Sequence, residues 1–267
     1  MNKDIIVDHI IERLKSNVKN LSTGNFKFWV IEDLLPINIA QEIAEAFPSD
    51  TLLRERNSLR EYKKVGVAFE DYNPIMEDIT YAFHDKRVVQ AIEKITGFDR
   101  MVPDYELYAG GLSSMAKNSF LNPHLDNSHN NSKDMYRVLN LLYYISSDWK
   151  HEYGGNLILY PDGMNSKEIE ITSKFNSLVL METNDQSFHG VSKVSNENSR
   201  RCVSNYYFRS NSTVDHDYEH VTKFYKFNND SNIKSVTLNL DRFLRQNLSA
   251  PIKKLVKYKN WHLRKND

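Results

Sequence analysis

Cysteine, glycine and net charge are all scarce in this sequence. The 267 residues include one cysteine, Cys202, which excludes a disulfide framework and any zinc or iron–sulfur site built from several cysteines. Nine glycines are too few for a collagen-like or linker-like chain. Lys and Arg number 35, as do Asp and Glu, so the zero net charge disfavours a nucleic-acid binder that relies on overall positive charge. A metal bound here would need oxygen and nitrogen ligands, for which nine histidines are available.

Long hydrophobic runs are absent as well. No stretch of about 18 apolar residues occurs, so no segment is expected to span a membrane. Asp4, Asp8 and Glu12 interrupt the apolar residues at the N-terminus, which a secretory signal does not tolerate, so we expect a cytoplasmic protein. Hydrophobic residues make up 40% of the chain and aromatic residues 12%, which is enough for one folded core and excludes wholesale disorder.

Residues 1–104 are predicted to form an N-terminal support of helices and a strand. Apolar residues at helical spacing predict an amphipathic helix over 5–14, and the pattern over 26–31 is typical of a strand. A second helix is expected to begin at Pro36 and to end at Pro48. Residues 74–96 are expected to form two short helices, the second of which ends at Gly97.

The sequence changes character at Tyr105. Short runs rich in β-branched and aromatic residues follow one another, separated by turn-forming residues and without helical stretches between them. These runs cover 105–112, 137–146, 154–161, 167–172, 176–183 and 200–208. Such a series indicates an antiparallel sandwich or jelly roll over 105–212, so we expect a mainly β fold with flanking helices (α+β). Residues 54–72, 127–136 and 210–234 are predicted to be loops that select the substrate.

Residues 213–267 are predicted to form a C-terminal extension that ends in a helical, basic tail. Residues 241–267 contain eight Lys and Arg against two Asp. Such a segment is typical of a surface for an anionic partner or of a solvated helix face, and both interpretations stay open. The three segments are expected to form one structural unit.

His124-Leu125-Asp126 is the only His-x-Asp in the sequence. On a strand, residues i and i+2 point to the same face, so both side chains can bind one ion. An imidazole and a carboxylate supply two ligands of the facial triad that holds non-haem Fe(II). His189, which follows a predicted strand, is the candidate for the third ligand.

Arg200 opens the last predicted strand of the core, eleven residues after His189. Two-residue alternation places Arg200, Cys202 and Ser204 on one face and Arg201 on the other. A guanidinium is a good bidentate clamp for a carboxylate, and the hydroxyl of Ser204 can add a hydrogen bond. Iron with open positions and a carboxylate clamp one strand away suit 2-oxoglutarate, which would chelate the metal at one end and need a cation at the other.

Together these motifs resemble the Fe(II)/2-oxoglutarate-dependent dioxygenase superfamily, specifically its prolyl-4-hydroxylase-like branch. The similarity runs over 110–208 and includes GGLSSMAKNSFLNPHLDNS, RVLNLLYYISSDWKHEYGGNLILYPDG, FNSLVLMETNDQSFHG and RRCVSNYYF. The second of these segments is very similar to the same region of oxygen-sensing prolyl hydroxylases, and 26–47 resemble the strand and helix that precede the core in bacterial members. The resemblance implies a double-stranded β-helix (jelly roll, cupin-like) core.

The resemblance also implies roles for individual residues. His124, Asp126 and His189 match the iron ligands, and Arg200 matches the residue that pairs with the far carboxylate of 2-oxoglutarate. The other positions matched to the co-substrate site are Tyr144, Ser204, Leu142 and Leu157, with Asn140 on the same strand face as Leu142. Ser114 departs from the pattern, because relatives often carry a larger polar or aromatic residue there, and its contact with the co-substrate is left unassigned.

The activity implied by the resemblance is that of a dioxygenase that uses Fe(II), 2-oxoglutarate and O2, hydroxylates an unactivated C–H bond and releases succinate and CO2. Asp126 favours hydroxylation, because related halogenases carry a small residue in its place. The substrate stays open among a prolyl or peptidyl residue, an amino acid and another small metabolite, including a saccharide. The alternative from another class is a catalytically inactive jelly-roll binding module.

Overall fold

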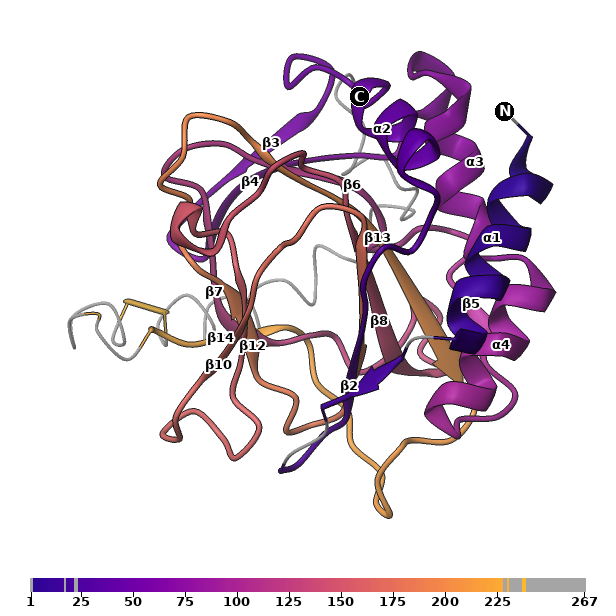
Figure 1. The fold of residues 1–267 in the computed structure, drawn as a ribbon. Helices are drawn as coiled ribbons and strands as arrows, with labels where there is room; N and C mark the ends of the chain where they lie inside the picture. The colour runs from indigo at the N-terminus through magenta and orange to yellow at the C-terminus, as the bar shows by residue number, and fades with distance from the viewer. Residues whose placement is uncertain (1, 17, 22–23, 228–229, 231–236, 239–267) are drawn as a thin grey trace.

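Fourteen strands in the described part of the chain join into one curved sheet in the computed structural model (Figure 1). The structure describes residues 2–16, 18–21, 24–227, 230 and 237–238. In chain order the strands are β1 (Lys19–Asn20), β2 (Phe28–Ile31), β3 (Arg54–Asn57), β4 (Glu61–Gly66), β5 (Val102–Pro103), β6 (Gly111–Met115), β7 (Phe120–Leu125), β8 (Tyr136–Tyr144), β9 (Leu157–Leu159), β10 (Ile169–Ile171), β11 (Ser177–Glu182), β12 (His189–Val191), β13 (Arg200–Arg209) and β14 (Lys223–Phe224). The prediction of a mainly β chain with flanking helices is confirmed.

Strands that are distant in the chain are neighbours in the sheet. The path runs β1-β2-β11-β8-β13-β6-β4-β7-β12-β9-β10, while β14 pairs with β7, β3 with β4 and β5 with β13. The pairings are antiparallel, as in a jelly roll. The sheet curls so far that Asn140 of β8 touches Asp126, which directly follows β7. The inside of this curl is therefore enclosed by strands from both halves of the sheet.

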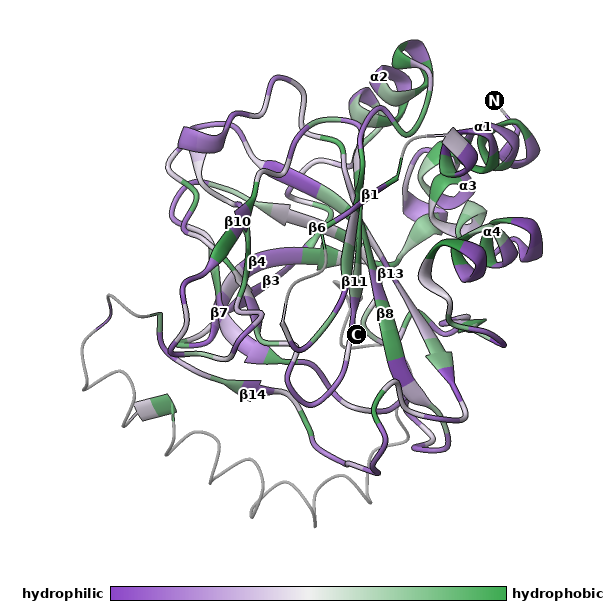
Figure 2. Cartoon of the chain, turned by 60° about the horizontal axis from the view of Figure 1, so that its bottom comes forward, coloured by the Kyte–Doolittle hydropathy of each residue, from purple (hydrophilic) through white to green (hydrophobic). Residues whose placement is uncertain are grey.

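Four α-helices cover the outer face of the sheet: α1 (Lys3–Ser16), α2 (Ile37–Glu45), α3 (Pro74–Ala82) and α4 (Lys86–Thr96). Figure 1 shows α1, α3 and α4 side by side next to β8 and β13, and in Figure 2 each helix carries both hydrophobic and hydrophilic residues. Local sequence sets the helix ends, because Asn73 and Asp85 cap α3 and α4 with their side chains and Gly97 ends α4 at φ 75°. The described chain also contains two 3₁₀ turns, η1 (Phe69–Asp71) and η2 (His151–Tyr153).

The central strands present a different chemistry on each face. On β8, Leu139, Leu141 and Tyr143 point into the apolar core beneath the helices, whereas Leu142 and Tyr144 point to the inside of the curl. Strands β11 and β13 alternate in step with β8, because their registers align residue by residue with it. The outer face therefore anchors the helices, and the inner face is free to build a site.

A β-bulge interrupts this alternation near the start of β8. Tyr207 of β13 pairs with Leu139 and Phe208 pairs with Arg137, so Val138 has no partner in the ladder. Val138 and Leu139 both enter the apolar core beneath the helices. As a result Arg137, which plain alternation along β8 would turn outward, lies inside the curl next to the residues of the site.

The described chain departs from the sequence predictions in three places, one of which is the predicted loop 210–234, where Lys223–Phe224 form β14. Residues 54–72 are not simply a loop, because β3 and β4 form a hairpin there and η1 follows it. Over the predicted strand 105–112, only Gly111 and Leu112 are in β6, and 105–110 form turns and bends. The predicted basic tail, 241–267, lies outside the described residues. Among the residues that are described, no helix has the length and apolar character needed to cross a membrane.

Candidate metal and co-substrate site

Three metal-binding side chains meet where β7 and β12 pair. His124 lies on β7 directly opposite His189 on β12, and Asp126 follows β7 at once. The Nε2 atoms of His124 and His189 lie 3.4 Å and 3.6 Å from the carboxylate oxygens of Asp126. One ligand atom from each of the three residues falls within 4.8 Å of the others. The i, i+2 spacing and the strand pairing thus bring two imidazoles and a carboxylate to one point.

Both imidazoles are oriented by hydrogen bonds at Nδ1. His124 Nδ1 lies 2.9 Å from the carbonyl oxygen of Asn122, and His189 Nδ1 lies 2.9 Å from that of Ser187. A carbonyl only accepts, so Nδ1 carries the proton in each ring and Nε2 is left as a lone-pair donor. Burial lowers the pKa of His189 to about 4, which keeps this ring neutral near pH 7. Neutral imidazole with a free Nε2 is the form that binds a metal ion.

The carboxylate of Asp126 is held in its ionised form. Burial opposes ionisation, but the charge of Arg137 and the neighbouring histidines hold its pKa well below the usual range. Asn140 donates a hydrogen bond of 2.7 Å to Oδ2, and Nη1 of Arg137 lies 3.4 Å from the same oxygen. Asn140, placed with the co-substrate residues from the sequence, therefore contacts an expected iron ligand. Two neutral nitrogens and one fixed carboxylate match the donor set of a non-haem Fe(II) site.

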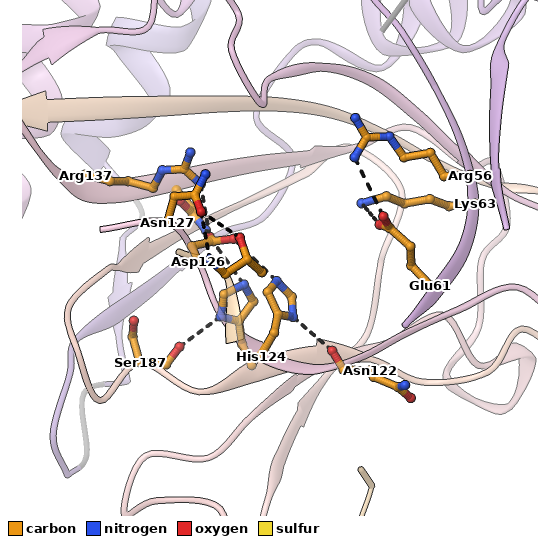
Figure 3. A network of polar contacts seen from close by, with 12 residues as sticks. Arg56, Glu61, Lys63, Asn122, His124, Asp126, Asn127, Arg137 and Ser187 are labelled. Atoms are coloured by element: carbon orange, nitrogen blue, oxygen red, sulfur yellow. Dashed lines mark hydrogen bonds and ion pairs between the residues drawn. The ribbon is translucent and has the colours of Figure 1, made fainter. Parts of the chain in front are cut away.

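Arg137 is a site residue that the sequence did not indicate. Its side chain is 2% exposed, and its guanidinium stacks on the ring of Tyr206 at 4.2 Å. In Figure 3 Arg137 lies on one side of Asp126 and His124, with a separate charged group on the other. Regular alternation along the strand predicts the opposite orientation, and the bulge that reverses it has no signature in this sequence.

Arg200 lies deeper inside the curl and is fixed through its Nε atom. Nε donates to the carbonyl of Gly155 and to the hydroxyl of Ser173, both at 3.1 Å, while Nη1 lies 3.7 Å from the sulfur of Met115. The guanidinium carbon lies 4.8 Å from the centre of the Tyr144 ring. The Tyr144 hydroxyl is buried without a hydrogen-bond partner, and burial raises its pKa, so it stays protonated. A protonated phenol beside a fixed guanidinium fits the far carboxylate of 2-oxoglutarate.

Paired glycines let the chain pass close to Arg200. Gly154 and Gly155 have φ values of 67° and 64°, and a Cβ on Gly154 would lie 2.0 Å from the carbonyl oxygen of Lys193. A Cβ on Gly155 would lie 3.2 Å from Cγ of Arg200. The two glycines therefore combine a left-handed backbone with a close approach that a side chain would obstruct.

The remaining positions expected to contact the co-substrate line the same interior. Leu142 and Leu157 belong with Tyr144 and Cys202 to one apolar cluster, and the Ser204 hydroxyl lies 3.7 Å from the Cys202 sulfur. Burial raises the pKa of the Cys202 thiol, so it remains protonated and inert. These residues form a mostly apolar wall with one hydroxyl at its edge.

Two neighbouring residues of these strands point the other way. Nη1 of Arg201 donates to the carbonyl of Ala44, and its guanidinium lies 5.2 Å from the centre of the Phe47 ring. The hydroxyl of Ser114 donates to the carboxylate of Asp50 at 2.7 Å. Because Ser114 pairs with Arg201 across β6 and β13, both face away from the curl, and Ser114 makes no part of the interior wall.

A second charged group from the β3–β4 hairpin borders the metal site. Glu61 lies 3.1 Å from Lys63 and 3.7 Å from Arg56, and Figure 3 shows the three side chains across from Arg137. Burial raises the pKa of Glu61, but the charges of Lys63 and Arg56 bring it down to about 2. This hairpin was expected to be a loop, and its charged sequence lacks the apolar alternation that predicts strands.

Comparisons with known proteins agree with this geometry. Residues 110–209 match a family model described as the 2OG-Fe(II) oxygenase superfamily. No curated protein matches the sequence.

Several solved structures share the fold. A prolyl-4-hydroxylase from Pseudomonas putida is 14% identical with a TM-score of 0.52, over 77% of this chain and 99% of that chain. A prolyl hydroxylase from Trichoplax adhaerens, in complex with a hypoxia inducible factor peptide fragment, is 18% identical with a TM-score of 0.52, over 77% and 90% of the two chains. A prolyl 4-hydroxylase from Phytophthora capsici is 17% identical with a TM-score of 0.51, over 91% and 76%. These neighbours confirm the double-stranded β-helix fold, and the buried His124–Asp126–His189 triad lies within residues 110–209, which match the 2OG-Fe(II) oxygenase family model.

Proposed function

We propose that this protein hydroxylates an unactivated C–H bond of its substrate and converts 2-oxoglutarate and O2 to succinate and CO2. One observation carries the proposal: the buried triad and the Arg200–Tyr144 pair lie on the same inner surface of one sheet. One oxygen atom of O2 enters succinate and the other enters the substrate as its hydroxyl, so the two electrons from the decarboxylation and the two from the C–H bond balance the reduction of O2.

One group of residues in the site would bind the metal, and another would bind the far carboxylate of 2-oxoglutarate. His124 and His189 bind Fe(II) through Nε2, Asp126 binds it through its carboxylate, and the bound metal with 2-oxoglutarate supplies the activation of O2. Arg200 and the hydroxyl of Tyr144 bind the far carboxylate of 2-oxoglutarate. The three residues would hold the metal and would leave coordination positions for the co-substrate and O2.

The apolar residues of the wall exclude water from the co-substrate. Leu142 and Leu157 pack with Tyr144 and flank the path between the metal and Arg200, and Ser204 adds a hydroxyl at the edge. A water-poor surrounding strengthens the ion pair between Arg200 and the carboxylate.

The test is metal and co-substrate binding followed by turnover. Purified protein given Fe(II) without oxygen is expected to bind 2-oxoglutarate, and to form succinate when oxygen and a substrate are admitted. His124→Ala is expected to lose iron binding and succinate formation, whereas His151→Ala, with a side chain 60% exposed and away from the triad, is expected to retain both. Protein that binds neither Fe(II) nor 2-oxoglutarate would contradict the proposal.

A further inference from the structure

The guanidinium of Arg137 is held in place but only partly paired. Nη1 faces Asp126, and the plane of the group stacks on Tyr206, with Phe208 5.9 Å away. Nε and Nη2 are buried and have no hydrogen-bond partner in the described chain. Leaving charged donors buried without a partner is unfavourable, so we expect the Nε and Nη2 side of the guanidinium, here called its free edge, to bind a hydrogen-bond acceptor.

The chemistry of that acceptor follows from the shape of the free edge. Nε and Nη2 point their hydrogens in parallel, which matches the two oxygens of a carboxylate. Asp104 is a buried carboxylate whose pKa responds to the charge of Arg137, yet the two form no ion pair in the described structure. A carboxylate brought by a ligand would satisfy both donors at once.

A second buried polar atom without a partner belongs to the loop after β11. The loop after β11 lies beside the start of β8, because the amide of Thr183 donates to the carbonyl of Val138 at 2.9 Å. In this loop Oδ2 of Asp185 lies 2.9 Å from Nε2 of His216, while Oδ1 is buried without a partner. Asp185 therefore keeps one oxygen for a donor from outside the protein.

His220 is a third buried polar side chain of this region. Both ring nitrogens of His220 are buried without a partner. Burial lowers the pKa of His220, and the charges of Asp185 and Asp126 act in the opposite direction. The amide and hydroxyl of Ser128, two residues after Asp126, donate to the carbonyl of His220 at 3.0 Å. His220 is thus tied to the metal-binding loop and lies within electrostatic reach of both carboxylates.

We infer that this region binds a small zwitterionic substrate, a free amino acid or a close analogue, through its carboxylate on Arg137 and its ammonium on Asp185. The inference rests on the proposed function and names the substrate class of the same site. A residue within a peptide carries neither charge at its backbone, so it would leave both the free edge of Arg137 and Asp185 without a charged partner. Arg137 touches both a metal ligand and the substrate in this arrangement, which brings the side chain of the amino acid to the iron.

The experiment tests each of the amino acids found in proteins as a ligand in three forms: the free amino acid, its carboxamide and its N-acetyl derivative. Dissociation constants are measured without oxygen on the Fe(II)- and 2-oxoglutarate-loaded protein, and succinate formation is measured with oxygen. At least one free amino acid is expected to bind at least about tenfold more tightly than either derivative and to stimulate succinate formation. Equal binding of all three forms, no binding by any, or tighter binding of the N-acetyl carboxamide, which mimics a peptide, would overturn the inference.

Two variants test separately which residue binds the carboxylate and which residue binds the ammonium of the amino acid. Arg137→Gln is expected to abolish the preference for the free acid over the carboxamide and to keep the preference for the free amine, and Asp185→Asn is expected to do the reverse. Arg209→Gln, which removes an outward arginine paired with Asp99, is the control and is expected to keep both preferences. Retention of the acid preference in Arg137→Gln would overturn the assignment.

Failure of the inference can be told apart from failure of the proposed function. Binding of Fe(II) and 2-oxoglutarate by the wild-type protein is measured before any amino acid is added. If that binding holds and the panel shows no charge preference, only the substrate class is wrong. If it does not, the proposed function itself is wrong.

Discussion

The two faces of strand β13 treat their polar side chains in different ways. On the outer face, Arg201 reaches the carbonyl of Ala44, Asn205 bonds His84 at 2.8 Å, and the Tyr207 hydroxyl donates to the carbonyl of Phe83. On the inner side, Arg200 is anchored through Nε and through a weak contact of Nη1 with the Met115 sulfur, and the hydroxyl of neighbouring Tyr144 has no hydrogen-bond partner in the described chain. The outer polar groups join strands to helices, whereas the inner ones are oriented and left for a ligand. Adjacent residues of one strand therefore serve stability and binding separately.

Replacing each of the two adjacent arginines by glutamine in turn gives the largest expected difference in 2-oxoglutarate affinity. Arg200→Gln is expected to raise the dissociation constant of 2-oxoglutarate about 100-fold, because the charged contact with the far carboxylate is lost. Arg201→Gln is expected to leave that constant within about twofold and to lower the free energy of unfolding by about 1 kcal/mol. Calorimetric titration and urea unfolding of both variants measure the contrast. A larger loss of affinity in Arg201→Gln would mean that the faces are assigned the wrong way round.

A pH titration of stability tests the outer face. Burial lowers the pKa of His84 to about 4, so between pH 6.5 and about 4 the unfolded chain takes up a proton that the folded chain does not. His84 is therefore expected to cost about 3 kcal/mol of stability as the pH falls through this range. Urea unfolding at pH 7, 5.5 and 4.5 is expected to show a weaker pH dependence in His84→Gln than in the wild type. Parallel curves would refute the role of His84.

The glycine beside Arg200 allows a finer test of the inner face. Gly155→Ala is expected to lower the free energy of unfolding by about 1–2 kcal/mol and to weaken 2-oxoglutarate binding, because its φ is positive and its Cβ would press on Arg200. Gly163 also has a positive φ, 91°, but a Cβ there would contact nothing within 4 Å. Gly163→Ala is thus the matched control, with a backbone cost and unchanged 2-oxoglutarate binding. Equal affinities in the two variants would show that the contact with Arg200 is unimportant.

The smallest expected effect is that of the hydroxyl that orients Arg200. Ser173 donates to the carbonyl of Gly155 at 2.6 Å and accepts from Nε of Arg200, so Ser173→Ala removes one of two anchors. The dissociation constant of 2-oxoglutarate is expected to rise about threefold to tenfold. Ser173→Thr, which retains the hydroxyl, is expected to recover part of this loss. Equal weakening in both variants would point to packing rather than to the hydrogen bond.

Regular strand alternation explains how much of the site could be predicted from sequence. Once β13 is recognised as a strand, period-two geometry separates Arg200 from Arg201, and the His-x-Asp spacing brings His124 and Asp126 to one point. The same rule fails at Arg137, because one unpaired residue in the ladder reverses the orientation of everything before it. Ser173 lies in a loop, where no periodicity tells which way a hydroxyl points.

The β3–β4 hairpin and the pairing of β14 with β7 beside the metal site could not be predicted from the sequence, for a different reason. β3 reads Arg-Glu-Arg-Asn, and such charged segments become strands only because neighbouring strands supply hydrogen bonds. Phe224 stacks on His124 at 5.2 Å through the pairing of β14 with β7, a contact between segments 100 residues apart. Long-range pairing of this kind is set by the whole fold and has no local signal.

The bulge at Val138 has a consequence for how this protein can change. The residues proposed to bind 2-oxoglutarate lie at the end of β8 and Arg137 lies at its start, with the irregular step between them. Inserting one residue in β13 opposite Val138 would restore the regular ladder and turn the Arg137 side chain away from the metal site, while Leu142 and Tyr144 keep their orientation. Deleting Val138 would instead leave Arg137 facing inward. One strand thus consists of two sections that insertions and deletions can alter separately, so substrate preference can diverge while the oxygen-activating chemistry is inherited intact.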